Sequence, residues 1–77
     1  MKVKVLFFGV LTEVTGMEIK FYEEIRSLEH LKMRITDDFP EITHYQFKVS
    51  LNNDLMNGDS KLKNGDEIAL LPPFEGG

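Results

Sequence analysis

The last residues of the chain have the types and spacing most suited to chemistry. Two adjacent prolines, Pro72 and Pro73, precede a terminal pair of glycines, Gly76 and Gly77. Glycine has no Cβ and can enter a narrow channel in any backbone conformation. Proline fixes φ and holds the base of such a tail away from a sheet. Because a carboxylate is a poor electrophile, we expect the Gly77 carboxylate to react only after another enzyme activates it, for example by adenylation.

The tail has enough reach to work inside a second protein. Residues 72–77, fully extended, span at most roughly 20 Å, so the folded body of residues 1–71 can stay outside a partner while the flexible tail enters it. Phe74 is either a core residue that clamps the tail or an aromatic anchor for a partner pocket, and we favour the anchor. The partner-binding residues expected in the tail are Pro72, Pro73, Phe74 and Glu75. The residues expected to enter the partner and carry the reacting carboxylate are Gly76 and Gly77.

Other residues that often do chemistry have ordinary structural roles here. His30 and His44 have neither a cysteine nor a ligand spacing near them, so we expect no metal site. Ser27 is a helix cap rather than a nucleophile, because no paired base is indicated. Gly9 and Gly16 lack the pattern and the lysine of a phosphate-binding loop. We therefore expect this chain to bind no cofactor and to supply no catalytic groups of its own, which disfavours a small stand-alone enzyme.

Composition limits the class of protein further. The 77 residues suffice for one domain. The net charge is −4 and the nine basic residues are scattered, which disfavours nucleic-acid binding. An acidic balance favours encounter with basic protein surfaces, or simply keeps the protein soluble. The absence of cysteine and of a long apolar run predicts a cytoplasmic protein with no membrane segment.

The first part of the chain predicts two strands. In residues 3–8, one face of the predicted strand carries Val3, Val5 and Phe7 and the other carries Lys4, Leu6 and Phe8. Both faces are apolar near the end of this run, as in a central strand. Residues 17–21 predict a second strand, with Glu18 and Lys20 on a solvent-facing side. Residues 11–16 form the connection between them, with room for one helical turn.

One amphipathic helix follows. Its apolar stripe comprises Leu28, Leu31, Ile35 and Phe39. Ser27 is a good N-cap, and Pro40 stops the helix and forces Phe39 out of helical geometry. Asp37 and Asp38 oppose the helix dipole at this end. They are either a solvated end, which we favour, or part of an acidic docking face.

The remaining segments complete a mixed sheet. Strands are predicted at residues 47–51, 55–56 and 67–71, with turns at 52–53, 57–59 and 64–66. One helix can cover only one side of a sheet. The order predicts an α+β fold of the β-grasp (ubiquitin-like) type, a mixed sheet of about five strands with one main helix on one face. Leu6 and Phe8 would then lie on the uncovered face, in a partner interface or in the core, with Leu71 as a further candidate.

The residues that end the chain also resemble a known family. Residues 65–77 read as a Gly-Asp-Glu turn, an apolar strand, two prolines and Gly-Gly, which resembles the small subunit of molybdopterin synthase, among the MoaD/ThiS-like sulfur carriers. Residues 6–16 resemble the opening strand and loop of this family, and residues 49–52 the stretch before its central hairpin. Thr12 departs from the family, which often has Arg there.

The resemblance implies a cycle with several partners. An E1-like activating enzyme adenylates Gly77 with ATP, and a sulfur donor converts the adenylate into a thiocarboxylate. The carrier then docks into the large catalytic subunit of molybdopterin synthase for molybdenum cofactor biosynthesis, and that subunit supplies the catalytic groups. A carrier in a tungsten-using pathway would have the same sequence features. Within the same fold, the alternatives are a carrier for thiamine thiazole synthesis or a ubiquitin-like modifier. In a different class, the alternative is a β-grasp module that binds without covalent chemistry.

Overall fold

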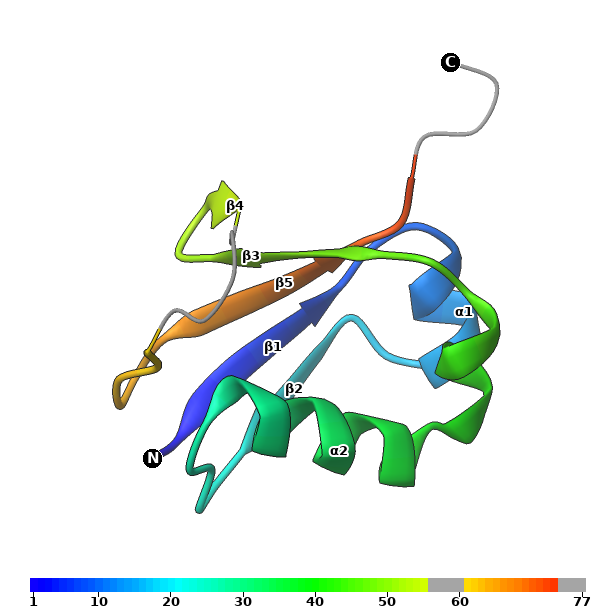
Figure 1. Ribbon diagram of the computed structural model, residues 1–77. Helices are drawn as coiled ribbons and strands as arrows, with labels where there is room; N and C mark the ends of the chain where they lie inside the picture. The colour runs from blue at the N-terminus through cyan, green and yellow to red at the C-terminus, as the bar shows by residue number, and fades with distance from the viewer. Residues whose placement is uncertain (56–60, 74–77) are drawn as a thin grey trace.

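The computed structural model describes residues 1–55 and 61–73, and within these five strands form one mixed sheet in the order β2-β1-β5-β3-β4 (Figure 1). The elements follow the chain as β1 (Val3–Phe7), α1 (Val10–Thr15), β2 (Ile19–Tyr22), α2 (Leu28–Asp38), the 3₁₀ helix η1 (Pro40–His44), β3 (Lys48–Leu51), β4 (Asp54–Leu55) and β5 (Glu67–Leu71). The predicted fold class, a mixed sheet of about five strands with one main helix, is confirmed.

Strand pairing decides which segments meet at each edge of the sheet. β1 lies between β2 and β5, as the apolar character of both its faces predicted. It pairs antiparallel with β2 and parallel with β5, with Val5 opposite both Lys20 and Ile68. Because parallel strands end at the same edge, the segments that follow β1 and β5 leave the sheet side by side (Figure 1).

The predicted signals for α2 are all present at its ends. The Ser27 hydroxyl accepts a hydrogen bond of 3.0 Å from the backbone N–H of His30. Phe39 leaves helical geometry with φ −133°, directly before Pro40, because a residue before proline is pushed out of the α region. Leu31 and Ile35 are buried and hold the helix against one face of the sheet.

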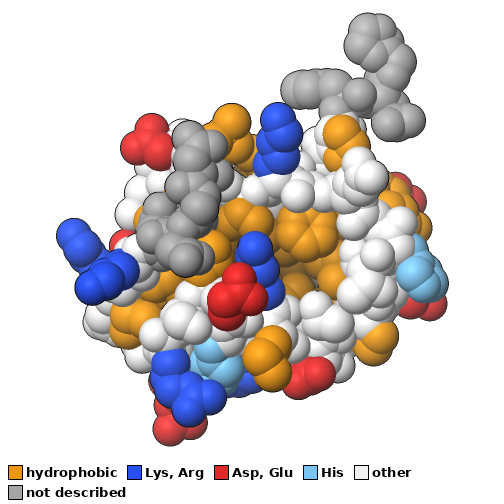
Figure 2. All heavy atoms as spheres, viewed as in Figure 1, with side chains coloured by type: hydrophobic (Ala, Val, Ile, Leu, Met, Phe, Trp, Pro, Cys, Tyr) orange, Lys and Arg blue, Asp and Glu red, His pale blue; other side chains and the backbone are white. Residues whose placement is uncertain are grey.

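The core lies between α2 and that face. The strand residues that point to it are Val3, Val5, Phe7, Tyr22, Ile68 and Leu70, all nearly inaccessible to solvent. Toward β3 the helix leaves an apolar hollow of about 210 Å³ that includes Phe47, Val49 and Ile42, visible between α2 and β3 in Figure 2. A single helix of eleven residues is too narrow to cover the whole sheet.

Several local predictions need correction. Residues 11–16 were expected to form a connection with room for one helical turn, and the structure extends this turn to a six-residue helix, α1 (Val10–Thr15), that buries Leu11. A 3₁₀ helix, η1, follows Pro40 where none was predicted. β2 starts at Ile19 rather than residue 17, and β4 (Asp54–Leu55) starts at Asp54 rather than residue 55, while Met56 lies outside the described residues. The turn predicted at residues 57–59 lies outside the described residues.

The end of α2 is tied to β2 and is also open to solvent. Tyr22, only 1% exposed, donates a hydrogen bond of 2.8 Å from its hydroxyl to Oδ2 of Asp38. Lys20 and Arg34 lie over the Tyr22 ring at 5.3 and 5.5 Å. Asp38 therefore secures the helix to the strand while its side chain stays 41% exposed, so the preferred interpretation of a solvated end agrees with the structure for this residue.

We expect Tyr22→Phe to lower the free energy of unfolding by about 1–2 kcal/mol, because it removes a hydrogen bond to a charged partner at a buried position. Urea unfolding followed by circular dichroism measures the change. Tyr45→Phe is the matched control, since Tyr45 is 39% exposed. Equal unfolding midpoints for the two variants would contradict a stabilising role for the bond.

The same residue predicts a response to alkaline pH. Burial raises the pKa of Tyr22 well above its ordinary value, and the hydrogen bond to Asp38 raises it further. The stabilisation is therefore complete below the unfolded pKa of about 10 and is lost as the pH rises from there toward the higher folded value. We expect unfolding midpoints to fall more steeply above pH 10 in the wild type than in Tyr22→Phe. Parallel profiles would show that Tyr22 does not titrate with unfolding.

Candidate functional site: the base of the tail and the uncovered face of the sheet

The Gly-Asp-Glu turn before β5 is a structural device that positions this strand. Gly65 has φ +88°, a conformation that L side chains rarely adopt. Asp66 is buried and accepts hydrogen bonds at Oδ2 from the backbone of Lys63, 2.7 Å, and at Oδ1 from the side chain of Asn52, 3.1 Å. Asn52 also accepts one from the Glu67 N–H. These contacts lock the start of β5 to the β3–β4 turn.

β5 then carries the chain to the base of the tail. Its last residue, Leu71, pairs with Lys48 of β3, and Pro72 follows at the edge of the sheet. Pro72 and Pro73 line a hollow of about 430 Å³ together with Val10 of α1 and Tyr45. Pro72 is half-buried and Pro73 is exposed. The two prolines therefore directly follow β5, and the role of residues 72–77 as a tail stays a prediction.

The face of the sheet opposite α2 carries exposed apolar side chains. We call this surface the open face: its exposed and half-buried apolar members are Leu6, Phe8, Ile19, Phe21 and Leu71, and the buried Ala69 lies among them. Phe8 is 44% exposed and Phe21 58%. Leu6 is opposite both Ile19 and Ala69 in the strand register. Exposed apolar side chains gathered in this way are typical of a protein interface.

The open face has a hollow next to the turn that begins α1. Leu6, Phe8 and Ile19 line this hollow of about 230 Å³ together with Thr12 and Glu18. Thr12 donates a hydrogen bond of 2.8 Å from its hydroxyl to the Gly9 carbonyl. The residue that departs from the family pattern thus lies in the same hollow as the apolar residues, and its hydroxyl is already used within the turn.

Charged side chains border the open face without crossing it. Lys4 and Glu67 face each other across β1 and β5 with Nζ and Oε2 3.6 Å apart. Lys2 lies over the ring of Phe21 at 5.5 Å. An ion pair this exposed contributes little stability. The arrangement is an apolar surface with a polar rim, the usual anatomy of an interface.

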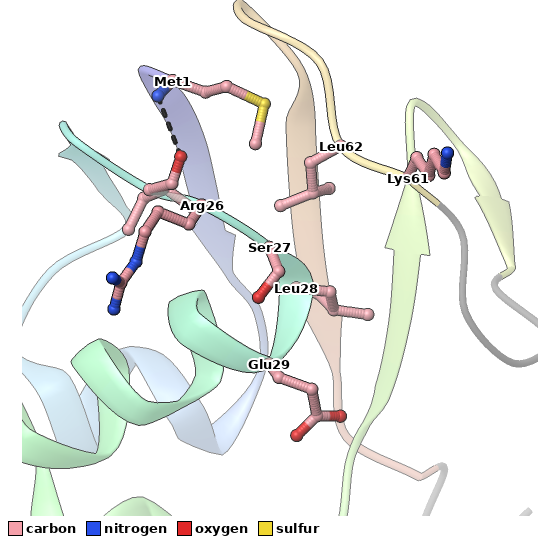
Figure 3. Close-up of a pocket in the computed structure, with 8 residues that line it drawn as sticks. Met1, Arg26, Ser27, Leu28, Glu29, Lys61 and Leu62 are labelled. Atoms are coloured by element: carbon pink, nitrogen blue, oxygen red, sulfur yellow. Dashed lines mark hydrogen bonds between the residues drawn. The ribbon is translucent and has the colours of Figure 1, made fainter.

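A further hollow of about 800 Å³ is lined by Met1 and by residues at the start of α2, at the opposite end of the sheet from Pro72. Met1, Arg26, Ser27 and Glu29 line it on one side, and Lys61 and Leu62 on the other (Figure 3). The Met1 ammonium donates a hydrogen bond of 2.8 Å to the Ile25 carbonyl, and Ser27 caps α2. These polar groups have structural roles, so we do not count this hollow as part of the candidate site.

Two further properties follow from the described parts of the chain. Among residues 1–55 and 61–73, no three His, Cys, Asp or Glu side chains gather closely enough to hold a metal ion. No helix in these same ranges has the length and apolar character needed to cross a bilayer.

The structure tests only some of the predicted site residues. Leu6 and Phe8 lie together on the open face, and Pro72 and Pro73 lie at the edge of the sheet. Phe74, Glu75, Gly76 and Gly77 lie outside the described residues, so their roles stay predictions.

Two apolar residues of the open face, Ile19 and Phe21, were missed by sequence reasoning. They were placed in a strand with one wet face, formed by Glu18 and Lys20. In the structure Lys20 shares the helix side with Tyr22, while Ile19 and Phe21 point to the open face. The signal in the sequence was the aromatic residue Tyr22 directly after Phe21. Two adjacent aromatic residues in a strand point to opposite faces, so both faces of β2 carry a large side chain.

The sheet order, the single main helix and the tail after β5 define a β-grasp protein of the ubiquitin-like class. The chain belongs to the ThiS family, whose model matches residues 5–77. It is 31% identical over 78 aligned residues to the molybdopterin synthase sulfur carrier subunit of Haemophilus influenzae, covering 95% of this chain and 96% of that protein.

Solved structures agree with this family. A chain in a complex of subunits 1 and 2 of the molybdopterin-converting factor from Helicobacter pylori is similar to this chain at 31% identity and a TM-score of 0.76, with both chains fully covered. SAMP1 of Haloferax volcanii has a TM-score of 0.83 at 19% identity, also over the whole of both chains, and this likeness shows the fold alone.

Proposed function

We propose that the chain is a sulfur carrier for molybdenum cofactor biosynthesis, acting as the small subunit of molybdopterin synthase. The observation that carries the proposal is the junction of β5 with Pro72 and Pro73, which places the base of the tail directly after the strand, in a hollow shared with Val10 and Tyr45. The names of its relatives, a sulfur carrier subunit and a two-subunit complex, support the same role.

The chemistry takes place at the Gly77 carboxylate. One of its oxygens attacks the α-phosphorus of ATP on an E1-like activating enzyme, and pyrophosphate leaves. A nucleophilic sulfur from a donor then attacks the acyl carbon and AMP leaves. When the donor is a persulfide, the product of this attack is an acyl disulfide, and a thiol then attacks its donor-side sulfur, which releases the thiocarboxylate and leaves the donor in a disulfide with that thiol. This chain binds no cofactor in the cycle, because ATP is held by the activating enzyme.

The loaded carrier docks on the large subunit and its tail enters the active site there. Leu6, Phe8 and the rest of the open face provide a dry apolar contact, and Phe74 with Glu75 adds contacts along the tail. Ordering each flexible residue costs about 1–2 kcal/mol of backbone entropy. Pro72 and Pro73 reduce that cost because their φ angles are restricted before docking.

Intact mass spectrometry tests this proposal. The purified protein is mixed with its cognate activating enzyme, ATP and a sulfur donor, and we expect a mass gain equal to the exchange of one oxygen for sulfur. Omitting ATP is the control. An unchanged mass with an activating enzyme that loads its own carrier would contradict the proposal and favour a module that binds without covalent chemistry.

The acceptor distinguishes the remaining alternatives. Loaded protein that forms molybdopterin from the cyclic pterin precursor with the large subunit supports the proposed branch. Formation of the thiamine thiazole, or of an isopeptide bond to a lysine, would instead assign a thiamine carrier or a ubiquitin-like modifier. Use in a tungsten pathway and a cytoplasmic location also stay predictions.

A further inference from the structure

The turn between β1 and α1 depends on an unusual backbone conformation at Gly9. This residue has φ +55° and ψ −134°, a combination that L side chains rarely adopt. The turn is secured on both sides of it. The Leu11 N–H donates to the Phe8 carbonyl at 3.0 Å, and the Gly9 carbonyl accepts from both the N–H and the hydroxyl of Thr12.

Gly9 lies directly against the base of the tail. The parallel register pairs Phe7 with Leu70, so two residues further along both strands Gly9 is opposite Pro72. A Cβ built on Gly9 would lie 2.9 Å from Cγ of Pro72 and 3.8 Å from its Cδ. Carbon atoms in contact prefer separations of about 3.5–4.0 Å. The ring of Pro72 thus occupies the space that a side chain at position 9 would need.

We propose that Gly9 is a positioning residue for sulfur loading and transfer. Because Gly9 has no side chain, the Pro72 ring can pack directly against it, and this contact sets the direction in which the tail leaves the domain. This inference deepens the proposed function and rests on it for its catalytic consequence. The contact itself joins two residues of the described structure and is a property of the fold.

A side chain at position 9 is expected to move Pro72 rather than the turn. Three hydrogen bonds hold the turn at the Phe8 and Gly9 carbonyls, and Gly9 is preceded by the central strand β1. Pro72 lies beyond the last paired residue of β5, and its rigid ring cannot rotate away from the contact. The tail reaches at most roughly 20 Å beyond this point. A small reorientation at Pro72 is therefore magnified at Gly77.

Two glycine variants separate positioning from backbone strain. Gly9→Ala introduces both the clash with Pro72 and the cost of a positive φ. Gly16→Ala, at the other end of α1, carries only the smaller cost of the left-handed helical region, with φ +75° and ψ 14°, and its Cβ has no neighbour within 4 Å. We expect both variants to fold, with the melting temperature of Gly9→Ala lowered more, and the double variant with Pro72→Ala, described below, keeps the strain at position 9 while removing the clash. Gly65→Ala, with φ +88° and open space around its Cβ, is a second control of the same kind.

The rate of thiocarboxylate formation with saturating activating enzyme is the functional readout. Misplacing a reacting group by about 1 Å can cost about 100-fold in rate, so we expect Gly9→Ala to lose at least about tenfold, while Gly16→Ala stays within about twofold of wild type. The double variant Gly9→Ala/Pro72→Ala removes Cγ of Pro72 and is expected to recover part of the loss. Equal rates for the two glycine variants would overturn the inference and leave the proposed function intact.

A second readout does not depend on loading. The chain has no cysteine, so a spin label on Glu75→Cys is unique and broadens the amide NMR signals of residues near the tail. We expect the broadening pattern over residues 10–15 and 44–46 to change in Gly9→Ala and to match wild type in Gly16→Ala. An unchanged pattern in Gly9→Ala would overturn the inference. A wild-type protein that is never loaded would defeat the proposed function, while this measurement would still decide whether Gly9 directs the tail.

Discussion

Deleting Gly77 is expected to abolish thiocarboxylate formation and leave the folded domain unchanged. The shortened chain still ends in a glycine carboxylate, but that carboxylate lies one residue, about 3.3–3.6 Å, short of the reacting position. A displacement of this size removes the near-attack geometry on which an activating enzyme depends. Intact mass after incubation with activating enzyme, ATP and sulfur donor measures the loss.

Two further tail variants show which property of the end matters. Gly77→Ala keeps the length and the carboxylate but adds a Cβ, and we expect slow loading, since a narrow channel favours glycine. One residue added after Gly77 blocks the carboxylate, and we expect no loading. All three variants should unfold at the same urea concentration as wild type. Normal loading of the deletion variant would show that the chain end is not the carrier group.

Phe8→Asp is expected to weaken binding to the large subunit by about 30-fold or more. A buried aromatic anchor is worth at least about 2 kcal/mol when removed, and each 1.4 kcal/mol is a factor of ten in the dissociation constant. The new carboxylate would in addition be buried without a partner beside Leu6 and Ile19 in the apolar hollow of the open face. Calorimetry with the unloaded proteins measures affinity independently of sulfur chemistry.

Met33→Asp is the matched control for this variant. Met33 is 64% exposed and belongs to α2, on the other side of the sheet from the open face, so the same change of side chain is made at an exposed apolar position outside the proposed interface. We expect its affinity for the large subunit to stay within about twofold of wild type. If both variants bound equally well, the open face would not be the docking surface.

Local signals in the sequence predicted most of the elements correctly. Ser27 and Pro40 delimit α2 because capping and proline geometry depend on adjacent residues alone. The turn at Asn52 and Asn53 also follows from residue type, since both adopt positive φ, which asparagine tolerates. The α1 helix was expected only as a possible helical turn within a connection, because its six residues give too little periodicity to detect.

Contacts between distant segments were beyond such reasoning. Nothing near Tyr22 in the sequence indicates that its hydroxyl bonds Asp38, because that pairing depends on how α2 crosses the sheet. The exposed side of β2 depends in the same way on its register with β1, and a shift of one residue would exchange its two faces. Ile19 and Phe21 therefore joined the candidate interface only once the sheet was assembled.

By itself, the sequence determined the fold class, the main helix and the character of the tail, because periodicity, caps and the Pro-Pro and Gly-Gly pairs act over a few neighbouring residues. Only the tertiary structure decided that Gly9 meets Pro72 and that Leu6, Phe8 and Ile19 share one hollow. The physical reason is the parallel pairing of β1 with β5. It joins segments from opposite ends of the chain, and its register arises from packing of the whole sheet.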